Sequence, residues 1–316
     1  MNRGLGKISM KIAITGATGF VGSCLVSKLQ KQGHQVVVLT RNSNYARKVF
    51  PSSSFPNVEI ATYTPDVLGD WQNAISGCDG VVNLAGESIA EGRWTAEKKQ
   101  AIRDSRLGTT KNIVTAIANA EQKPSVLINA SAIGYYGTSE TASFTETSPS
   151  GNDFLAEVCQ GWEGEAQKVS DTGTRLVILR LGIVLDMGGG ALAKMITPFK
   201  MFAGGPIGSG NQWFSWIHRD DVVNLIIQAL TDSNLSGVYN ATAPNPVRMN
   251  ELSQVMGQVL NRPSWLPVPS FAIEALLGDG AMVVLEGQQV LPQCTLDGGF
   301  QYQYPNLRSA LVDICK

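Results

Sequence analysis

The sequence predicts an α/β fold: a doubly wound parallel sheet with helices on both faces, followed by a smaller C-terminal lobe. Short apolar runs rich in β-branched residues alternate with longer helical patterns through about the first 185 of the 316 residues. Several of these runs, such as VVVL at 36–39, lack polar alternation, which is typical of strands buried on both faces. A glycine-rich turn joins the first strand to the first helix.

The elements follow one another in a regular order. Strands are expected near 11–15, 35–40, 58–61, 80–84, 125–131 and 175–181. Helices are expected near 20–31, 95–120 and 153–170. After residue 185, glycines at 188–190 and 204–210 and prolines at 263–269 are typical of loops. The expected domains are 10–185 plus about 216–240 for the sheet, and about 186–215 with 241–316 for the small lobe.

The composition excludes several classes of protein. Because 25 Lys and Arg balance 26 Asp and Glu, the net charge of −1 gives no reason to expect nucleic acid as a partner. The 43% of hydrophobic residues excludes a largely disordered chain. No apolar run approaches the roughly 18 residues of a transmembrane helix. A soluble globular protein without a transmembrane segment is expected.

The cysteines indicate a reducing compartment. All five are scattered without a C-x-x-C pair, which argues against a disulfide scaffold and a zinc module, so no metal is expected. The first ten residues lack the apolar stretch of a secretory signal. These features predict a cytoplasmic protein, or a protein of the plastid stroma if a transit peptide has been removed.

The strongest functional signal is the segment KIAITGATGFVG at 11–22. Its strand, Gly16-x-x-Gly19-x-x-Gly22 turn and apolar helix predict a dinucleotide-binding loop, with a structural turn as the alternative. Gly16 permits the tight turn, Gly19 lets the backbone approach a pyrophosphate, and the helix N-terminus offers N–H groups to phosphates. The expected cofactor contacts in this loop are Gly16, Thr18, Gly19, Phe20, Val21 and Gly22.

The end of the second strand favours NADP(H) over NAD(H). An NAD site usually places Asp or Glu there to bind the ribose 2′-OH. This chain has Thr40 and Arg41 instead, and neither Asp nor Glu occurs before Glu59. Arg41 can pair bidentately with a 2′-phosphate, and Thr40 can add a hydroxyl donor. The alternative is an arginine that is merely solvated.

Several motifs together carry a family resemblance. GATGFVG, NLAGESI and FSWIHRDDVV resemble the extended short-chain dehydrogenase/reductases. SAIGYYG, CQGWEGEA, GGPIGSGNQWFSWIH and the tail from 262 to 311 are similar to an atypical, epimerase-like branch of that group, also called cell-division-inhibitor homologues. The resemblance spans residues 10–315. It implies a Rossmann domain that binds NADP(H) and a small substrate lobe, but no known reaction.

The resemblance also implies further cofactor contacts. Leu84 and Ala85 would pass beside the adenosine ribose, and Arg106 would approach the cofactor from the following helix. Val184 would contact the nicotinamide end through its backbone. For the apolar residues, a position in the core is the alternative.

The usual catalytic pattern of the larger group is absent. Its members share a Tyr-x-x-x-Lys pair and a Ser or Thr on the preceding strand, but no tyrosine here has a lysine four residues later. If Tyr135-Tyr136-Gly137 is the family's turn, the hydroxyl position is Ala132. The neighbouring Ser131 should point to the opposite face of the strand, unless a bulge turns it.

Glu87 and Tyr136 are the candidate substitutes for the acid/base. Glu87 follows a strand end at the expected cofactor cleft, where burial can tune a carboxylate, and Tyr136 could donate a phenolic proton. Cys159 lies on the helix that normally carries the Tyr and Lys. The alternatives are that Glu87 only anchors a loop, that Tyr136 is a packing aromatic and that Cys159 is an inert buried thiol.

Three other clusters favour structural roles or leave the choice open. The run His218-Arg219-Asp220-Asp221 suggests a metal site or a catalytic triad. His34 is the only other histidine, however, and no second cluster supplies further metal ligands. The apolar run VVNLIIQAL follows, which favours helix N-capping by Asp220 or Asp221. The pairs Arg93-Trp94 and Trp213-Phe214 are candidates either for lining a substrate cleft or for the core.

Two functions follow from these features. The first is an NADP(H)-dependent, epimerase-like oxidoreductase with a non-standard acid/base, acting on a small carbonyl or sugar-like substrate. The second is a catalytically inactive cofactor-binding regulator or scaffold, linked to cell or plastid division as the family label suggests. The helices near 95–120 and 153–170 could pair across a two-fold axis in a homodimer.

Overall fold

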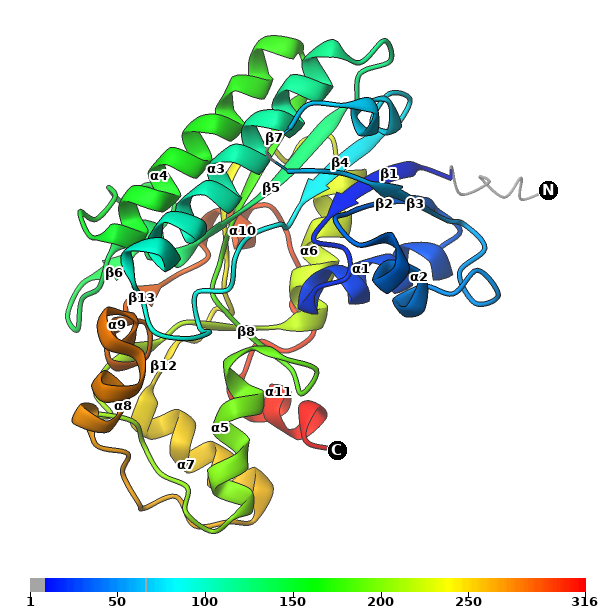
Figure 1. The fold of residues 1–316 in the computed structure, drawn as a ribbon. Coiled ribbons are helices and arrows are strands. Elements are labelled where there is room, and N and C mark those ends of the chain that lie inside the picture. Colours follow the sequence, from blue (N-terminus) through cyan, green and yellow to red (C-terminus); the bar gives the residue numbers. More distant parts are fainter. Residues whose placement is uncertain (1–8, 66) are drawn as a thin grey trace. The chain divides into compact units, whose positions relative to one another are not determined.

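The structure is a computed structural model that describes residues 9–65 and 67–316 (Figure 1). The prediction that the first ten residues are not a secretory signal falls mostly on residues 1–8, which lie outside the described part. Among the described helices, none is both long enough and apolar enough to cross a membrane.

Seven strands form the central sheet. In chain order they are β1 (Lys11–Thr15), β2 (Gln35–Thr40), β3 (Val58–Thr62), β4 (Gly80–Asn83), β5 (Val126–Ala132), β7 (Arg175–Leu181) and β11 (Gly237–Ala241). Across the sheet their order is β11-β7-β5-β4-β1-β2-β3. The pairs β1–β2, β1–β4, β2–β3, β4–β5 and β7–β11 are parallel.

These strands, flanked by helices, confirm the predicted α/β fold. The first six agree with the predicted strands to within one residue at each end. β11 was not predicted, because its sequence GVYNA is short and carries the polar Asn240. The apolar runs of β1 and β2 are buried, as expected for strands covered on both faces.

Five helices connect these strands or follow them. They are α1 (Phe20–Lys31), α2 (Ser43–Val49), α3 (Ala96–Asn119), α4 (Phe154–Gln167) and α6 (Arg219–Thr231). The predicted helices agree with α1, α3 and α4 to within three residues. In α1, the buried Leu25 and Leu29 are four residues apart and therefore lie on one face, which packs on the sheet. Figure 1 shows β1, β2 and β3 side by side, with α1 and α2 next to them.

Short strand pairs and helices make up much of the C-terminal half. The pairs are β8 (Ile183–Leu185) with β10 (Trp216–His218), β9 (Trp213–Phe214) with β12 (Val247–Arg248), and β6 (Ser143–Phe144) with β13 (Gln289–Val290). The helices are α5 (Gly190–Lys200), α7 (Met249–Leu260), α8 (Ser270–Leu277), α9 (Met282–Leu285), α10 (Gln293–Asp297) and α11 (Leu307–Ile314). Four short 3-10 helices are η1 (Asp70–Ala74), η2 (Ile133–Tyr136), η3 (Lys168–Thr172) and η4 (Gly278–Ala281).

Helices α5, α7 and α11 lie together in Figure 1 and share one apolar core. Leu192 and Ile196 of α5 pack in this core with Leu252 and Met256 of α7 and Leu311 of α11. In α5 and α7 the paired side chains are four residues apart, the spacing of one helix face.

The chain divides into two compact units. The first contains the residues up to Ala85, Gly108–Asn129 and Glu165–Leu176, and the second contains Gly86–Leu107, Ala130–Gly164 and Val177–Lys316. Strands β5 and β7 begin in the first unit and end in the second, so the sheet belongs to both. The boundaries of these two compact units differ from those predicted for the sheet domain and the substrate lobe. The division into a sheet domain and a substrate lobe stays a prediction.

Candidate functional site

The glycine loop leads from β1 directly into α1 in the first unit. Gly16 has a φ of +66°, and a Cβ added there would lie 2.7 Å from the carbonyl oxygen of Leu84. Only glycine fits this close approach. Leu84 and Ala85 therefore pass directly beside the loop, while their predicted contact with the adenosine ribose stays a prediction. A Cβ at Gly22 would lie 2.2 Å from the Gly16 carbonyl oxygen, so the third glycine is also required by packing.

The N-terminus of α1 is open to an anion. Its N-cap is Gly19, which has no side chain to accept a hydrogen bond from the first turn, and that turn contains no acidic residue. The first N–H groups of a helix have no partners within the helix, and the helix dipole adds a partial positive charge there. Thr18 and Gly19 precede this turn, and Phe20, Val21 and Gly22 begin it. This is the geometry of a phosphate-binding loop.

A buried polar network fixes the strand ends beside the loop. Asn83, the last residue of β4, accepts a hydrogen bond from Thr15 Oγ1 at 2.6 Å. Its Nδ2 donates to Asn129 Oδ1 at 2.7 Å and to Thr110 Oγ1 at 2.9 Å. All four side chains are buried. Because these groups satisfy one another, the network sets the positions from which the loop and Leu84 leave the sheet.

The end of β2 presents one exposed cation. Thr40 is buried, and its Oγ1 accepts a hydrogen bond from the Asn42 N–H at 3.2 Å. Arg41 is exposed, and no ion pair engages it within residues 9–65 and 67–316. The guanidinium is thus available to a ligand such as a 2′-phosphate.

In the second unit, helix α3 anchors the segment that follows β4. The Glu87 N–H donates to Ser105 Oγ at 2.9 Å, and the Glu87 carbonyl accepts from Arg106 Nη1 at 3.0 Å. The Glu87 carboxylate lies 2.6 Å from Lys98 Nζ. With 39% of its side chain exposed, Glu87 is a fixed, charged carboxylate that solvent and ligands can reach. Lys98 was not predicted, because nothing in the run EKKQ distinguishes it from a solvated lysine.

Arg106 is held firmly against the same segment. Its Nη1 also donates to the Ile102 carbonyl at 3.1 Å, and its guanidinium lies 5.2 Å from the Trp162 ring centre. Burial lowers the pKa of Arg106, while the charges of Cys159 and Glu87 act in the opposite direction. Val184, the other predicted contact in this unit, lies on β8 and pairs with Ile217 of β10.

A buried hydrogen-bonded network surrounds Tyr136. The Tyr136 hydroxyl donates to Asn240 Oδ1 at 2.7 Å and accepts from Arg180 Nη1 at 2.9 Å. Arg180 also forms a bidentate ion pair with Glu163, and Glu163 accepts a hydrogen bond from Ser131 Oγ at 2.6 Å. Burial raises the pKa of Tyr136 to about 12, although Arg180 opposes the shift. The phenol is therefore neutral near pH 7, and its proton is already shared with Asn240.

This network corrects the expectation for Ser131. Strand alternation predicted that Ser131 points away from the face of the catalytic hydroxyl, yet its Oγ reaches Glu163 on α4. Cys159 and Glu163 are four residues apart on α4, the spacing of the Tyr-x-x-x-Lys pair, and the Cys159 thiol donates to the Ala132 carbonyl at 3.7 Å. Burial raises the pKa of Cys159 to about 11, which makes it an inert thiol near pH 7.

Glu163 and Arg180 were not predicted as members of this network. Two signals in the sequence point to them. Arg180 lies in the apolar strand sequence RLVILRL, and Glu163 lies on the apolar face of α4. Because an arginine within a buried strand requires a buried acceptor, the sequence signals that Arg180 has an acidic partner, but it does not identify Glu163 as that partner.

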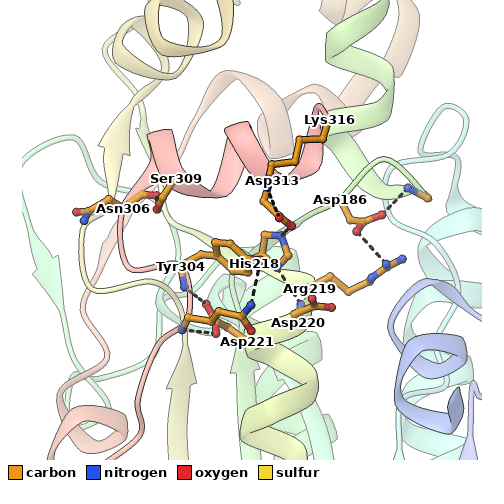
Figure 2. Close-up of polar contacts among 12 residues, drawn as sticks. Asp186, His218, Arg219, Asp220, Asp221, Tyr304, Asn306, Ser309, Asp313 and Lys316 are labelled. Atoms are coloured by element: carbon orange, nitrogen blue, oxygen red, sulfur yellow. Dashed lines mark hydrogen bonds and ion pairs between the residues drawn. The ribbon is translucent and has the colours of Figure 1, made fainter. Parts of the chain in front are cut away.

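Figure 2 shows the polar contacts of His218 and its neighbours, which favour a structural role for this cluster. The predicted N-capping by Asp220 or Asp221 is wrong, because α6 begins at Arg219 and its N-cap is His218. His218 Nδ1 accepts the Asp220 N–H at 3.1 Å. The buried Asp221 carboxylate accepts the backbone N–H groups of Gln303 and Tyr304 at 2.8 and 3.0 Å. Among the described residues, no three His, Cys, Asp or Glu side chains gather as a metal site.

The aromatic residues proposed for a substrate cleft make mostly internal contacts. Trp94 is buried, donates its Nε1–H to the Ile89 carbonyl at 2.9 Å and packs edge-on against Phe154. Trp213 donates to the Glu140 carbonyl at 3.0 Å, and Arg248 lies 3.8 Å from its ring centre. These contacts favour the core interpretation for Trp94, whereas Trp213 is only half-buried.

Comparison with known proteins identifies relatives along almost the whole chain. The model of the NAD dependent epimerase/dehydratase family matches residues 12–242, and a domain of unknown function, DUF1731, matches residues 268–314. The chain is 52% identical over 304 residues to the chloroplastic epimerase family protein SDR39U1 homolog of Arabidopsis thaliana, covering 96% of this chain and 86% of that protein. It is 40% identical to the epimerase family protein YfhF of Bacillus subtilis, covering 96% and 98% of the two chains.

A solved structure shares both the fold and the sequence. The human epimerase family protein SDR39U1, crystallised with NADPH, matches with a TM-score of 0.85 and 35% identity, over 96% of this chain and 99% of that one. The predicted NADP(H) preference agrees with the cofactor of this relative. The names of these relatives do not mention cell division, so that part of the resemblance stays a prediction.

Proposed function

Because the chain belongs to the NAD dependent epimerase/dehydratase family, as its motifs predicted, we propose that it is an NADP(H)-binding oxidoreductase. The observation that carries this proposal is the loop at Gly16, whose close approach to Leu84 and uncapped helix α1 fit a pyrophosphate. The NADPH in the structure of the human relative supports the choice of cofactor.

The residues of the first unit fit the three parts of the adenine half of the cofactor. The loop and the first turn of α1 would bind the pyrophosphate, Thr40 and Arg41 the 2′-phosphate, and Leu84 and Ala85 the adenosine ribose. Val184 is proposed for the nicotinamide end, through its backbone. When bound, NADP(H) supplies or accepts a hydride.

We assign the acid/base role to Glu87. Its carboxylate is partly exposed and lies 2.6 Å from Lys98 Nζ. Its backbone N–H and carbonyl are held by Ser105 and Arg106, so the side chain starts from a fixed position from which it can exchange a proton with a substrate. Tyr136 is less suited to this role, because it is 3% exposed and its proton is donated to Asn240. The substrate class remains a small carbonyl or sugar-like compound.

One observation favours the second candidate function, a cofactor-binding regulator without catalysis. At the spacing of the usual Tyr and Lys, α4 carries an inert thiol, Cys159, and a carboxylate, Glu163, that is fully engaged by Arg180 and Ser131. A regulator of this kind would bind NADP(H) but transfer no hydride.

The cellular setting belongs to the same proposal. The five cysteines are scattered without a C-x-x-C pair, which supports a reducing compartment, and one relative is chloroplastic. We propose the cytoplasm or the plastid stroma as the location. A homodimer formed through α3 and α4 is likewise a proposal.

Hydride transfer tests the enzyme against the regulator. NADPH carrying deuterium on one face of the nicotinamide is incubated with the protein and a panel of small aldehydes, ketones and oxidised sugars. The enzyme is expected to transfer the label from one face only and to lose at least 100-fold in turnover as Glu87→Gln. Glu91→Gln, an exposed carboxylate four residues later, is the matched control and should keep full turnover. Binding of NADPH without transfer to any compound would favour the regulator.

A further inference from the structure

Two neighbouring loops of the second unit expose large apolar side chains to solvent. The loop after α5 carries Met201 and Phe202, which are 72% and 63% exposed, and the loop after α7 carries Trp265, which is 75% exposed. Leu266 follows and is 44% exposed. Its backbone N–H donates to the Gly204 carbonyl at 3.0 Å, so the two loops lie side by side (Figure 1). Single exposed apolar residues are ordinary, whereas this adjacent group, the apolar loop cluster, marks a contact surface.

Phe202 is held in its exposed position at a cost in backbone energy. Its φ is +61°, in the left-handed region that bulky side chains rarely adopt. Among the described non-glycine residues only Asn261 also has a positive φ, and asparagine tolerates this region. A strained backbone persists where its surroundings fix it, and such positions cluster at functional sites. The strain therefore distinguishes Phe202 from an ordinary solvated loop residue.

The apolar loop cluster has a basic rim. The Arg262 guanidinium lies 4.5 Å from the Phe202 ring centre, and Lys200, the last residue of α5, is exposed next to Met201. No ion pair within residues 9–65 and 67–316 includes either cation. The segments 187–219 and 252–273, which contain both loops, have neither Asp nor Glu. The charge of these loops is therefore positive, although the net charge of the chain is −1, and it complements an anionic partner.

A polar pocket adjoins the second of these loops. It has a volume of about 450 Å³, and its polar lining comes from Gln254, Gln258, Asn261, Arg262 and Ser264. Arg262 Nη1 donates to the Asn261 carbonyl at 2.9 Å, but no described residue accepts a hydrogen bond from Nε or Nη2. Guanidinium, amide and hydroxyl groups together can bind a phosphate and the hydroxyl groups beside it.

The chemistry of a membrane surface fits both the cluster and the pocket. Trp side chains favour the boundary between headgroups and acyl chains, Phe inserts its apolar ring there, and Lys and Arg are attracted to anionic headgroups. A fluid bilayer accepts side chains that protrude this far, whereas a protein partner would need a matching cavity for each of them.

We propose that the apolar loop cluster inserts into the surface of an anionic membrane, while the pocket at Arg262 binds a lipid headgroup that carries a phosphate. This is a peripheral attachment, so it needs no membrane-spanning helix. It goes beyond the proposed function and does not depend on NADP(H) binding.

Co-sedimentation with lipid vesicles tests the proposal. The protein is mixed at one ionic strength with vesicles of phosphatidylcholine, either alone or with about one-third phosphatidylglycerol, which supplies negative charge. Trp265→Ser and Leu266→Ser shorten the apolar loop cluster, and because both side chains are exposed, the fold should be kept. Leu296→Ser on α10 is the matched control, since Leu296 is also 44% exposed. Circular dichroism checks that each variant is folded.

The proposal predicts at least tenfold stronger binding to the vesicles with phosphatidylglycerol. Trp265→Ser should weaken this binding at least fivefold and Leu266→Ser at least threefold, because each removes apolar area from the bilayer. Both should leave the NADPH Kd unchanged, and Leu296→Ser should change neither quantity.

Arg262→Gln tests the headgroup pocket. It should weaken binding to the anionic vesicles at least fivefold, whereas Arg103→Gln on α3, which loses a pair with Glu157, should not. If Arg262→Gln does not fold, Lys200→Gln removes the other charge of the rim at an exposed position and should reduce the preference for anionic vesicles.

Three results would overturn the proposal. Absence of binding to both kinds of vesicle, or equal binding by the wild type and Trp265→Ser, means that the cluster does not contact lipid. Equal binding to the two kinds of vesicle, or wild-type binding by both Arg262→Gln and Lys200→Gln, excludes the anionic headgroup. Sedimentation equilibrium without lipid that shows a dimer for the wild type and a monomer for Trp265→Ser assigns the cluster to a second copy of this chain.

Discussion

Glu163 of α4 and Arg180 of β7 form a bidentate ion pair whose two side chains are only 5% and 4% exposed. The Nε–Oε1 and Nη2–Oε2 distances are 2.9 and 2.8 Å. Ser131, Tyr136 and Asn240 complete the hydrogen bonding around the pair. A buried ion pair is tolerated only when each charged group keeps its opposite charge and its hydrogen bonds. Loss of one side chain should therefore leave the other as an uncompensated buried charge.

Removing one member of this pair should therefore destabilise the protein strongly. Glu163→Ala leaves Arg180 buried without its carboxylate, which is expected to cost about 3–5 kcal/mol in the free energy of unfolding. Lys168→Ala on the neighbouring turn breaks the more exposed pair with Glu165 and should cost less than about 1 kcal/mol. Urea denaturation followed by circular dichroism measures both. Equal costs for the two variants would contradict this account of the buried pair.

Tyr136→Phe tests whether the tyrosine supports the structure or the chemistry. Removal of the hydroxyl leaves Arg180 Nη1 and Asn240 Oδ1 without one partner each, which should cost about 1–3 kcal/mol of stability. NADPH affinity should be unchanged, and so should any turnover that depends on Glu87. A variant of wild-type stability that has lost turnover would instead make Tyr136 the acid/base group.

Gly16→Ala tests the close approach in the glycine loop. The added methyl group would meet the Leu84 carbonyl at 2.7 Å, in a backbone conformation that alanine rarely adopts. We expect at least a tenfold loss of NADPH affinity. Gly33→Ala is the control, since Gly33 has a similar positive φ of +87° but no heavy atom within 4 Å of its added Cβ. Gly33→Ala should lose stability through backbone strain alone and keep its NADPH affinity. If Gly33→Ala lost NADPH affinity and Gly16→Ala kept it, the assignment of the glycine loop to NADPH binding would be contradicted.

The histidine that caps α6 should make stability depend on pH. Burial lowers the pKa of His218, against the opposing charges of Asp220, Asp221, Asp313 and Asp186. The unfolded chain therefore binds a proton that the folded chain does not, once the pH falls below the unfolded value of about 6.5. The contribution of His218 to stability is present above that pH and is lost progressively as the pH falls toward its folded pKa.

His218→Asn isolates this contribution, because asparagine can still accept a hydrogen bond at an N-cap. The difference in unfolding free energy between the wild type and this variant, measured from pH 8 to pH 5, should shift against the wild type below about pH 6.5, with a slope of at most about 1.4 kcal/mol per pH unit. The same measurement in another His variant, His34→Asn, controls for general histidine titration. A difference that does not vary with pH would show that His218 has an ordinary pKa.

The parallel sheet and the glycine loop could be predicted because their signals are local. An apolar strand such as β2 is buried on both faces, and the turn at Gly16 requires residues that are adjacent in the sequence. The N-cap of α6 could not be predicted in the same way. Asp220 and Asp221 are common capping residues, but the start of the helix at Arg219 depends on the pairing of β10 with β8.

The network around Glu163 was missed for a different reason. Its members come from β5, η2, α4, β7 and β11, and only the fold brings them together. The sequence lacks a Tyr-x-x-x-Lys pair, and the groups that could replace it on sequence grounds are Glu87 and Tyr136. The ion pair of Glu87 with Lys98 likewise depends on how the segment after β4 folds back along α3.

The most direct test of the central claim is the affinity of the protein for NADPH and NADH, measured by nicotinamide fluorescence at one ionic strength. The account predicts micromolar binding of NADPH and at least tenfold weaker binding of NADH, a difference of about 1.4 kcal/mol. Arg41→Ala should remove this preference, whereas Arg47→Ala on α2, which hydrogen-bonds to Ser52, should keep it. Failure to bind either nucleotide, or equal binding of both by the wild type, would contradict the account.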